Sequence, residues 1–161
     1  IYKKIISGSN GLGGEWSLNQ MPETNSSNLK SENKLDFSNR IEGYLSGKSI
    51  EKNYQKKFKI KLTAKEIFFN YRNKDNNACA FINDYKNKLA RSLVIIITTL
   101  DPDAIVFGGG LSNEIDFLDE IKRITSNLIN EPNLKTIFLI PLYGDASGVR
   151  GAALLGRSKS I

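Results

Sequence analysis

Residues 100–113 read LDPDAIVFGGGLSN, and this stretch determines how the rest of the chain is interpreted. A turn that contains Pro102 leads into a short apolar run at 104–107, and three glycines and a polar pair follow it. The pattern predicts a buried strand that ends in a glycine turn and then opens a helix. Such a turn is one way to hold a nucleotide, and a plain tight connection between strand and helix is the alternative.

Two properties of this turn favour the nucleotide site. Glycine has no Cβ, so a ligand can lie directly against the main chain. The start of a helix adds free N–H groups and the positive end of the helix dipole, and both attract phosphate. The candidate nucleotide-binding residues are Gly108, Gly109, Gly110 and Ser112.

The flanks of the turn predict an α/β fold. Apolar residues recur at three- and four-residue steps over 78–99, which predicts one long helix with an apolar face of Phe81, Tyr85, Leu89, Leu93 and Ile96. We expect Asn113 to cap a second helix that ends near Asn130. Residues 136–142 predict a second strand, and the small residues of 144–156 predict a last helix pressed close to its neighbours. Helix, strand, helix, strand, helix is an α/β layout.

The segments that precede the long helix are shorter or more polar. Residues 2–7 read as a strand, and the polar residues of 23–39 read as a loop. Two amphipathic helices are expected, at 50–58 and 63–73. A threonine and a glutamate three residues apart, Thr63 and Glu66, predict a capping box at the start of the second.

The net charge of +6 is concentrated in residues 48–74, where nine Lys or Arg stand against two Glu and leave the rest of the chain about neutral. A nucleic-acid patch is one interpretation, and a solvated helical face is the other. Lysines outnumber arginines 17 to 6. Because arginine is the better bidentate partner of phosphate and bases, we favour the solvated face and expect no nucleic-acid partner.

Other sequence features bear on the compartment. No run of about twenty apolar residues is present, so no membrane span is expected, and the first residues do not form the apolar block of a signal peptide. A single cysteine, Cys79, excludes an internal disulfide and fits a reducing compartment. We expect a buried structural thiol at Cys79 and a cytoplasmic protein.

Four motifs, in this order along the chain, resemble the ROK family of sugar kinases and repressors. GEWSLNQMP at 14–22 is similar to the family's Gly-Glu-x-Gly-His segment, and RIEGYLSG at 40–47 to its Cys-x-Glu-x-x-x-Ser-Gly segment. LDPDAIVFGGGLSN at 100–113 and GDASGVRGAALLG at 144–156 resemble its C-terminal half. Among the family's kinases, the bacterial fructokinases and mannokinases show the strongest resemblance.

This resemblance implies the actin and hexokinase fold, which is ribonuclease H-like, with ATP and a sugar bound between two lobes. The chain then corresponds to the C-terminal lobe, at 1–161, with the N-terminal lobe absent. Matching carboxylates in the family bind sugar hydroxyls, which assigns Glu15 and Glu42 to a hexose such as fructose or mannose. ATP with Mg²⁺ is the implied cofactor, and a homodimer is the family expectation.

The chain departs from the family at its structural zinc site. By alignment to the motifs, the three cysteine positions fall at Asn33, Leu35 and Arg40, and the histidine position at Leu18. The chain contains no histidine at all. Zinc requires thiolate, imidazole or carboxylate ligands, so no zinc is predicted. In the family that histidine also contacts the sugar, so Leu18 implies weaker sugar binding or a different specificity.

No catalytic residue is assigned within the chain. Phosphoryl transfer needs positioning, Mg²⁺ and usually a carboxylate base, and in the resembled kinases the base and the phosphate motifs precede the part of the sequence seen here. Asp101, Asp103 and Asp145 are interpreted as turn or cap residues. We therefore expect this portion alone to be inactive. The alternative function is a non-catalytic, sugar-responsive transcriptional regulator of the same family, or a degenerate pseudokinase.

Overall fold

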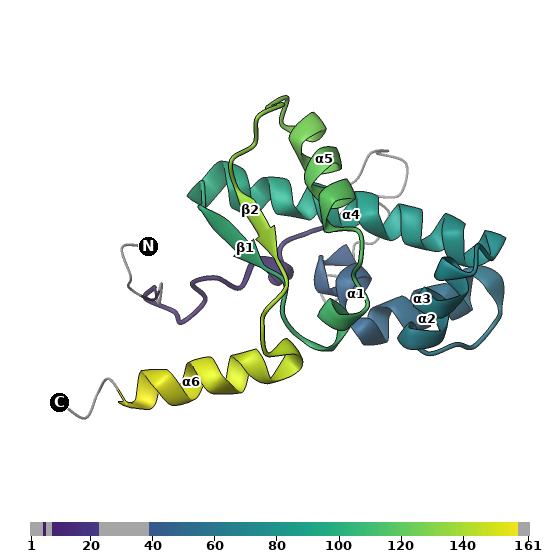
Figure 1. Cartoon of the computed structure of the whole chain (residues 1–161), viewed down its shortest axis with the longest axis horizontal. Coiled ribbons are helices and arrows are strands. Elements are labelled where there is room, and N and C mark those ends of the chain that lie inside the picture. Colours follow the sequence, from purple (N-terminus) through teal and green to yellow (C-terminus); the bar gives the residue numbers. More distant parts are fainter. Residues whose placement is uncertain (1–4, 6–7, 23–38, 158–161) are drawn as a thin grey trace.

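The computed structural model describes residues 5, 8–22 and 39–157. The helices are α1 (Glu42–Leu45), α2 (Gly47–Phe58), α3 (Ala64–Arg72), α4 (Asn76–Leu100), α5 (Leu118–Leu128) and α6 (Ser147–Arg157). The strands are β1 (Ala104–Val106) and β2 (Ile137–Leu139), and short 3-10 helices lie at η1 (Trp16–Leu18), η4 (Gly110–Asn113) and η5 (Gly144–Ala146). The predicted order of helix, strand, helix, strand, helix is present from α4 to α6 (Figure 1).

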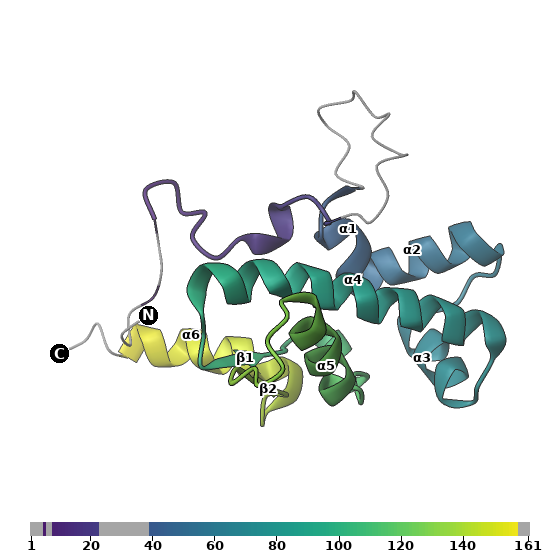
Figure 2. The same cartoon turned by 90° about the horizontal axis from the view of Figure 1, so that it is seen from above.

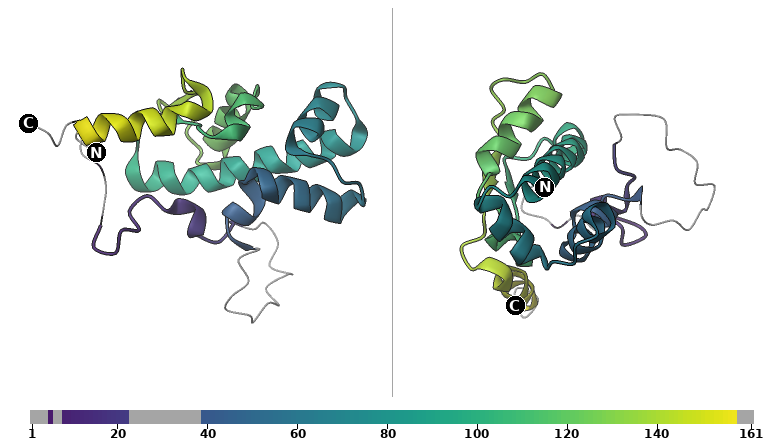
Figure 3. Two further views of the ribbon diagram at one scale, coloured as in Figure 1. Left: turned by 90° about the horizontal axis from the view of Figure 1, so that it is seen from below. Right: turned by 90° about the vertical axis from the view of Figure 1, so that its right-hand side faces the viewer.

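The long helix α4 is the middle layer of the molecule. The segment that contains η1, together with α1 and α2, lies along one side of it, and β1, β2 and α5 lie on the other (Figure 2). The end-on view separates the same layers and places α6 at the periphery, away from α5 (Figure 3). No helix of the described residues is long and apolar enough to span a bilayer.

The predicted apolar face of α4 is confirmed. Asp75 caps its start by accepting from Ala78 N at 2.8 Å, and Asp101 ends it in the left-handed region at φ 43°. Of the five predicted face residues, the first four are buried and Ile96 is partly buried: Phe81, Tyr85, Leu89, Leu93 and Ile96. Burial of the Tyr85 ring raises the pKa of its hydroxyl well above the ordinary range. The apolar face of α4 therefore forms part of the hydrophobic core.

The helix α3 forms where its sequence predicts, whereas α2 begins at Gly47, three residues before the predicted start of 50–58. Ser46 accepts from Ser49 N and caps α2, while Thr63 and Glu66 form the complete capping box of α3. The hydrogen bonds from Thr63 hold the pKa of the exposed Glu66 carboxyl below its usual value. The predicted capping box therefore marks the start of α3 correctly.

A cluster of aromatic side chains and one buried lysine connect α3, α4 and α5. Phe117 stacks on Phe68 with ring centroids 6.2 Å apart and meets the edge of Tyr71 at 6.1 Å. Lys86 is only 2% exposed, and its Nζ donates to Tyr71 Oη and to Glu120 Oε2, each at 2.6 Å. Burial alone would lower the pKa of Lys86, but these bonds outweigh it and raise the pKa, so the lysine stays charged.

The two strands form a parallel pair, with Ala104 opposite Ile137 and Val106 opposite Leu139. The prediction of a buried strand at 104–107 is wrong. Ile105 and Phe138 point inward, but Val106 remains 56% exposed on the other face. Alternate residues of a strand point to opposite faces, and only one face of this pair is covered.

Three further expectations are corrected by the structure. Asn113 does not cap α5, because a 3-10 helix intervenes and α5 begins only at Leu118. The glycines of α6 are not pressed against neighbours, since a Cβ at Gly148 or Gly151 would meet nothing within 4 Å. Cys79 is half-buried rather than buried, with its Sγ 3.8 Å from Tyr71 O. The expected strand at 2–7 and loop at 23–39 lie almost wholly outside the described residues.

Candidate nucleotide and sugar sites

The glycine turn follows β1 and is shaped by one left-handed residue. Gly109 has φ +88°, a conformation that residues with a Cβ rarely adopt. Ser112 closes the turn, because its N–H and its hydroxyl both donate to Gly109 O, at 3.0 and 2.7 Å. Ser112 is 3% exposed, so its hydroxyl faces the turn rather than solvent. Its place in the candidate site is therefore to hold the shape of the turn.

The main chain of the turn is accessible along its length. A Cβ built on Gly108, Gly109 or Gly110 would meet no atom within 4 Å. Among the described residues, the N–H groups of Gly108 and Gly109 donate no backbone hydrogen bond. Bare backbone with free donors can accept an anionic or polar ligand at close range. The helix dipole does not contribute as expected, because the turn leads into the four-residue η4 instead of an α-helix.

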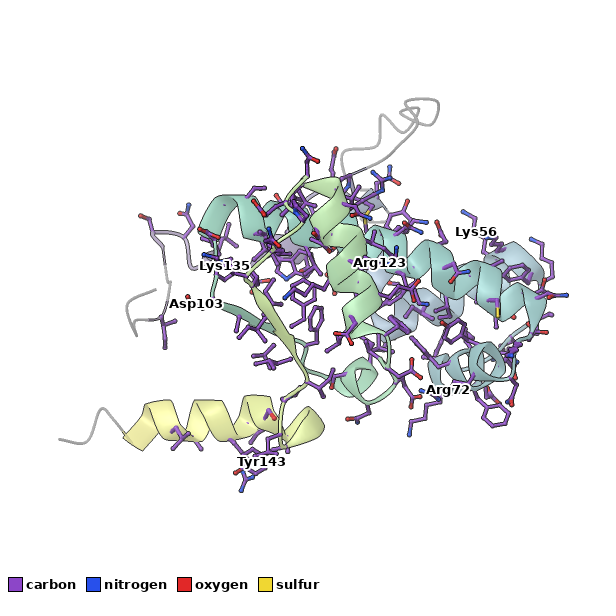
Figure 4. All side chains as sticks on the ribbon, turned by 45° about the horizontal axis from the view of Figure 1, so that its top comes forward. Lys56, Arg72, Asp103, Arg123, Lys135 and Tyr143 are labelled. Atoms are coloured by element: carbon purple, nitrogen blue, oxygen red, sulfur yellow. The ribbon has the colours of Figure 1, made fainter. Side chains whose placement is uncertain are left out.

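A second turn lies beside the first and was not assigned to the site from the sequence. A Cβ on Gly144, which has φ +55°, would lie 3.3 Å from Asn113 Oδ1, so η5 and η4 are in close contact. Next to it is the exposed Tyr143 ring (Figure 4), and the guanidinium carbon of Arg150 lies over this ring, 3.9 Å from its centroid. The Ser147 hydroxyl is buried and has no hydrogen-bond partner in the described part of the chain.

The two predicted sugar-binding carboxylates lie on two segments that backbone hydrogen bonds hold together. Glu15 is exposed and directly precedes η1, and Glu42 is exposed as the first residue of α1. An isolated antiparallel bridge pairs Gln20 with Arg40. Hydrogen bonds on both sides of this bridge, Met21 N to Asn39 O and Ile41 N to Asn19 O, are each 2.9 Å long. The bridge brings the η1 segment to the start of α1, and both carboxylates remain available to a ligand.

The sugar-side segment also contacts the glycine turn. Gly47 begins α2, directly after α1 and the cap Ser46, and a Cβ there would lie 3.8 Å from the Leu111 side chain of η4. Gly47 and Leu111 therefore bring the two candidate sites next to one another, and the spacing of residues along the sequence gave no signal for this proximity.

The positions of the family's zinc ligands carry residues that cannot replace them. Leu18 is 38% exposed and Arg40 lies in the bridge, while Asn33 and Leu35 lie outside the described residues. Within 5, 8–22 and 39–157, no group of three or more His, Cys, Asp or Glu could hold a metal ion. The absence of zinc stays a prediction that rests on residue types.

Comparison with known proteins identifies the same family. The sequence model of the ROK family matches residues 1–159. An N-acetyl-D-glucosamine kinase of Yersinia enterocolitica is 40% identical over 120 residues, which cover 74% of this chain and 39% of the relative. The Photobacterium profundum N-acetyl-D-glucosamine kinase is 34% identical over 161 residues, covering 96% of this chain and 53% of the relative. The chain therefore spans about half, or less, of the length of these relatives.

Solved structures show the same fold. A ROK hexokinase from Thermus thermophilus superposes with a TM-score of 0.76 at 18% identity, over 94% of this chain and 50% of that one. A ROK glucokinase from Streptomyces griseus, determined with glucose and AMPPNP, gives 0.64 at 22% identity over 74% of this chain and 45% of that one. The described elements are thus a portion of the actin-like ATPase fold of hexokinases. Because the family model covers nearly every residue, the chain belongs to the ROK family of sugar kinases and related proteins.

Proposed function

We propose that the protein containing this chain is a sugar kinase, which transfers the γ-phosphate of ATP to a hexose. The single observation that carries the proposal is the glycine turn. It follows a strand of a parallel pair, presents bare backbone at three consecutive glycines, and contacts the segment that carries Glu42 through Leu111 and Gly47. The chain's membership of the ROK family supports a nucleotide, rather than another anion, as the ligand of this turn.

The residues of the chain have distinct roles in this proposal. Gly108 and Gly109 offer N–H donors to the nucleotide, and ATP brings Mg²⁺, which neutralises its phosphates. Glu15 and Glu42 accept hydrogen bonds from sugar hydroxyls, and their charge strengthens each bond. These contacts orient the two substrates, which is the main contribution of protein to phosphoryl transfer. We assign no general base to the chain and propose that it comes from another part of the kinase, together with the remaining phosphate contacts.

For the sugar, N-acetylglucosamine is our first candidate, because the curated relatives described above are named for it. Fructose and mannose are the other hexoses that the motifs favour. Leu18 replaces the histidine that contacts the sugar in the family, and its side chain neither donates nor accepts a hydrogen bond. A panel of these three sugars, with phosphate transfer as the readout, identifies the substrate.

Alanine substitutions in the turn test the nucleotide site. Gly108 and Gly110 have no positive φ and have open space beside them, so a methyl group fits the free protein but projects toward a ligand on the backbone. We expect Gly108→Ala and Gly110→Ala to leave the melting temperature unchanged and to raise the ATP Kd about tenfold, a typical result of overpacking. The control is Asp119→Asn, at an exposed position on α5. Unchanged ATP affinity in both turn variants would reject the site.

The sugar side is tested by removing charge without changing shape. Glu15→Gln and Glu42→Gln each lose one charge-assisted acceptor, for which about 1.5–3 kcal/mol, or tenfold to a hundredfold in sugar affinity, is expected. Asp119→Asn, at an exposed position on α5, is the control. ATP affinity should be the same in all three. Sugar binding without phosphate transfer in the unsubstituted full-length protein would instead favour the regulator.

A further inference from the structure

One arginine holds the segment that connects the glycine turn to α5. Arg72, the last residue of α3, donates through Nη2 to Glu114 O at 3.0 Å and to Glu114 Oε2 at 2.9 Å. Its Nε donates to Asp116 Oδ2 at 3.3 Å. Glu114 directly follows η4, so the guanidinium binds the chain at the residue where the glycine turn and η4 end. Figure 4 shows Arg72 at the end of α3, whereas Arg123 lies on α5 away from it.

The far end of the same segment is fixed by other means. Phe117 lies in the aromatic cluster with Phe68 and Tyr71, and Lys86 binds Glu120 in the first turn of α5. Residues 114–116 lie between this anchored helix and the glycine turn and form no regular helix or strand. Contacts from Arg72 to both carboxylates and to one carbonyl therefore restrain the part of the connection that is closest to the turn.

We propose that Arg72 is a positioning residue for nucleotide binding, which acts by fixing the glycine turn through Glu114 and Asp116. This inference rests on the proposed function and adds a residue that touches neither substrate. Ser112 transmits the restraint, because it lies two residues before Glu114 and its hydroxyl closes the turn on Gly109 O. When the exit of the turn is held, the free N–H groups of Gly108 and Gly109 keep one orientation before the ligand arrives.

The chemistry of the contact requires arginine. A planar guanidinium presents several N–H donors in a fixed fork and can bind two carboxylates and a carbonyl at once, whereas an ammonium acts as a compact point charge. The Arg72 side chain is 39% exposed, that of Asp116 56% and that of Glu114 15%, so the network is open to solvent at Arg72 and Asp116. Exposed ion pairs add little to global stability, so the contact should influence local geometry more than the free energy of unfolding.

The test compares Arg72→Ala and Arg72→Lys with the control Arg123→Ala, an exposed arginine on α5 without an ion pair among the described residues. In the full-length protein we expect Arg72→Ala to raise the ATP Kd about tenfold, the typical loss for one charged hydrogen bond. Sugar Kd and melting temperature should stay near those of the unsubstituted protein. Arg72→Lys should restore only part of the affinity, and Arg123→Ala should change nothing.

Hydrogen exchange of the amides at 108–114, measured without ligand, provides the second readout. We expect faster exchange there in Arg72→Ala than in Arg123→Ala, with unchanged exchange in α4. Equal exchange in the two variants, or a parallel loss of ATP and sugar affinity, overturns the inference. If the unsubstituted protein binds no ATP, the proposed function fails, and the exchange data alone decide whether Arg72 holds the turn.

Discussion

The helical block of α2, α3, α4 and α5 differs sharply from the region formed by β1, β2 and α6. Large side chains in the block are wholly enclosed, including Tyr54, Ile67, Phe68, Ile82 and Leu93. In the strand and α6 region, apolar side chains of similar size are open to solvent, including Val106, Ile137, Leu142, Val149 and Leu154. The difference shows that the block contains its own core, whereas the other region presents apolar surface of the kind that normally packs against another part of a protein.

The contrast follows from how each element can be covered. Each helix of the block has one apolar stripe and a neighbour that buries it. A pair of strands has two faces and two edges, and here α5 packs against β2 while the outward residues Val106 and Leu139 remain exposed. Two strands alone are marginal in water, so this pair depends on the packing of Ile105 and Phe138 against the block.

The largest expected effect is the loss of a block side chain. Phe68 is fully enclosed, stacks on Phe117 and meets the edge of Tyr85. Phe68→Ala should lower the free energy of unfolding by about 4 kcal/mol, because the transfer free energy is lost and a cavity remains. Urea unfolding, followed by circular dichroism, measures this change. Val106→Ala is the matched change in the strand region, and a comparable loss there would contradict the contrast between the regions.

A smaller but still large effect is expected at the buried lysine. Glu120→Gln removes the charge that compensates Lys86 and leaves the buried ammonium with neutral acceptors, which are Tyr71 Oη and the amide oxygen of the new glutamine. A buried charge without a compensating charge destabilises the fold, so the free energy of unfolding should fall by about 3 kcal/mol.

The control for this variant is Asp119→Asn, on the exposed side of the same helical turn, which should change stability by less than about 0.5 kcal/mol. The raised pKa of Lys86 gives a second check by alkaline titration. The ion pair of Lys86 contributes fully to the free energy of unfolding below the pKa that Lys86 has in the unfolded chain. This contribution should disappear as the pH rises through the pKa of Lys86 in the folded protein. If Glu120→Gln retains full stability, the ion pair does not support α5.

Sequence patterns predicted the block well because its signals are local. The three- and four-residue repeat placed a helix at 78–99, and the structure has α4 at Asn76–Leu100. Thr63 and Glu66 predicted a cap whose two hydrogen bonds are both present. The ion pair between Lys86 and Glu120 joins residues that are 34 positions apart on different helices, and no pattern within one helix could indicate it.

The candidate site was predicted less completely. The glycines located the turn after β1, but the sequence suggested a helix start at Asn113, where the chain instead forms a 3-10 turn that four further residues separate from α5. Ser112 was assigned to the nucleotide, and the structure adds that its hydroxyl donates to Gly109 O within the turn. Gly144 and Arg72 reach the turn only through tertiary contacts, so neither could be found from the spacing of residues.

A moderate effect is expected from the cap of α3. Thr63→Ala removes the acceptor for Glu66 N and should lower the free energy of unfolding by about 1 kcal/mol. Glu66 itself is exposed, and its lowered pKa gives the pH dependence: the capping contribution is present above the unfolded pKa and is lost as the pH falls through the folded pKa. Stability measured from pH 7 to pH 3 should therefore differ in slope between the native chain and Thr63→Ala. Identical slopes would show that the capping box contributes nothing.

The smallest effect concerns α6, and its sign distinguishes the two regions. Gly151 lies inside the helix, is exposed, and has open space where a Cβ would stand. Alanine is a better helix former than glycine by about 0.5–1 kcal/mol, so Gly151→Ala should raise the melting temperature slightly if α6 faces solvent. Thermal unfolding of the isolated chain and of the full-length protein measures both cases.

Stabilisation in the isolated chain combined with destabilisation in the longer protein would mean that another part of the protein packs closely on α6 there. The exposed Val149 and Leu154 on the same helix would then be part of that contact, because a glycine that tolerates alanine only when uncovered marks a site of close approach. Stabilisation in both would mean that α6 is exposed in the longer protein too, and that the small residues of 144–156 serve the turn at Gly144 rather than helix packing.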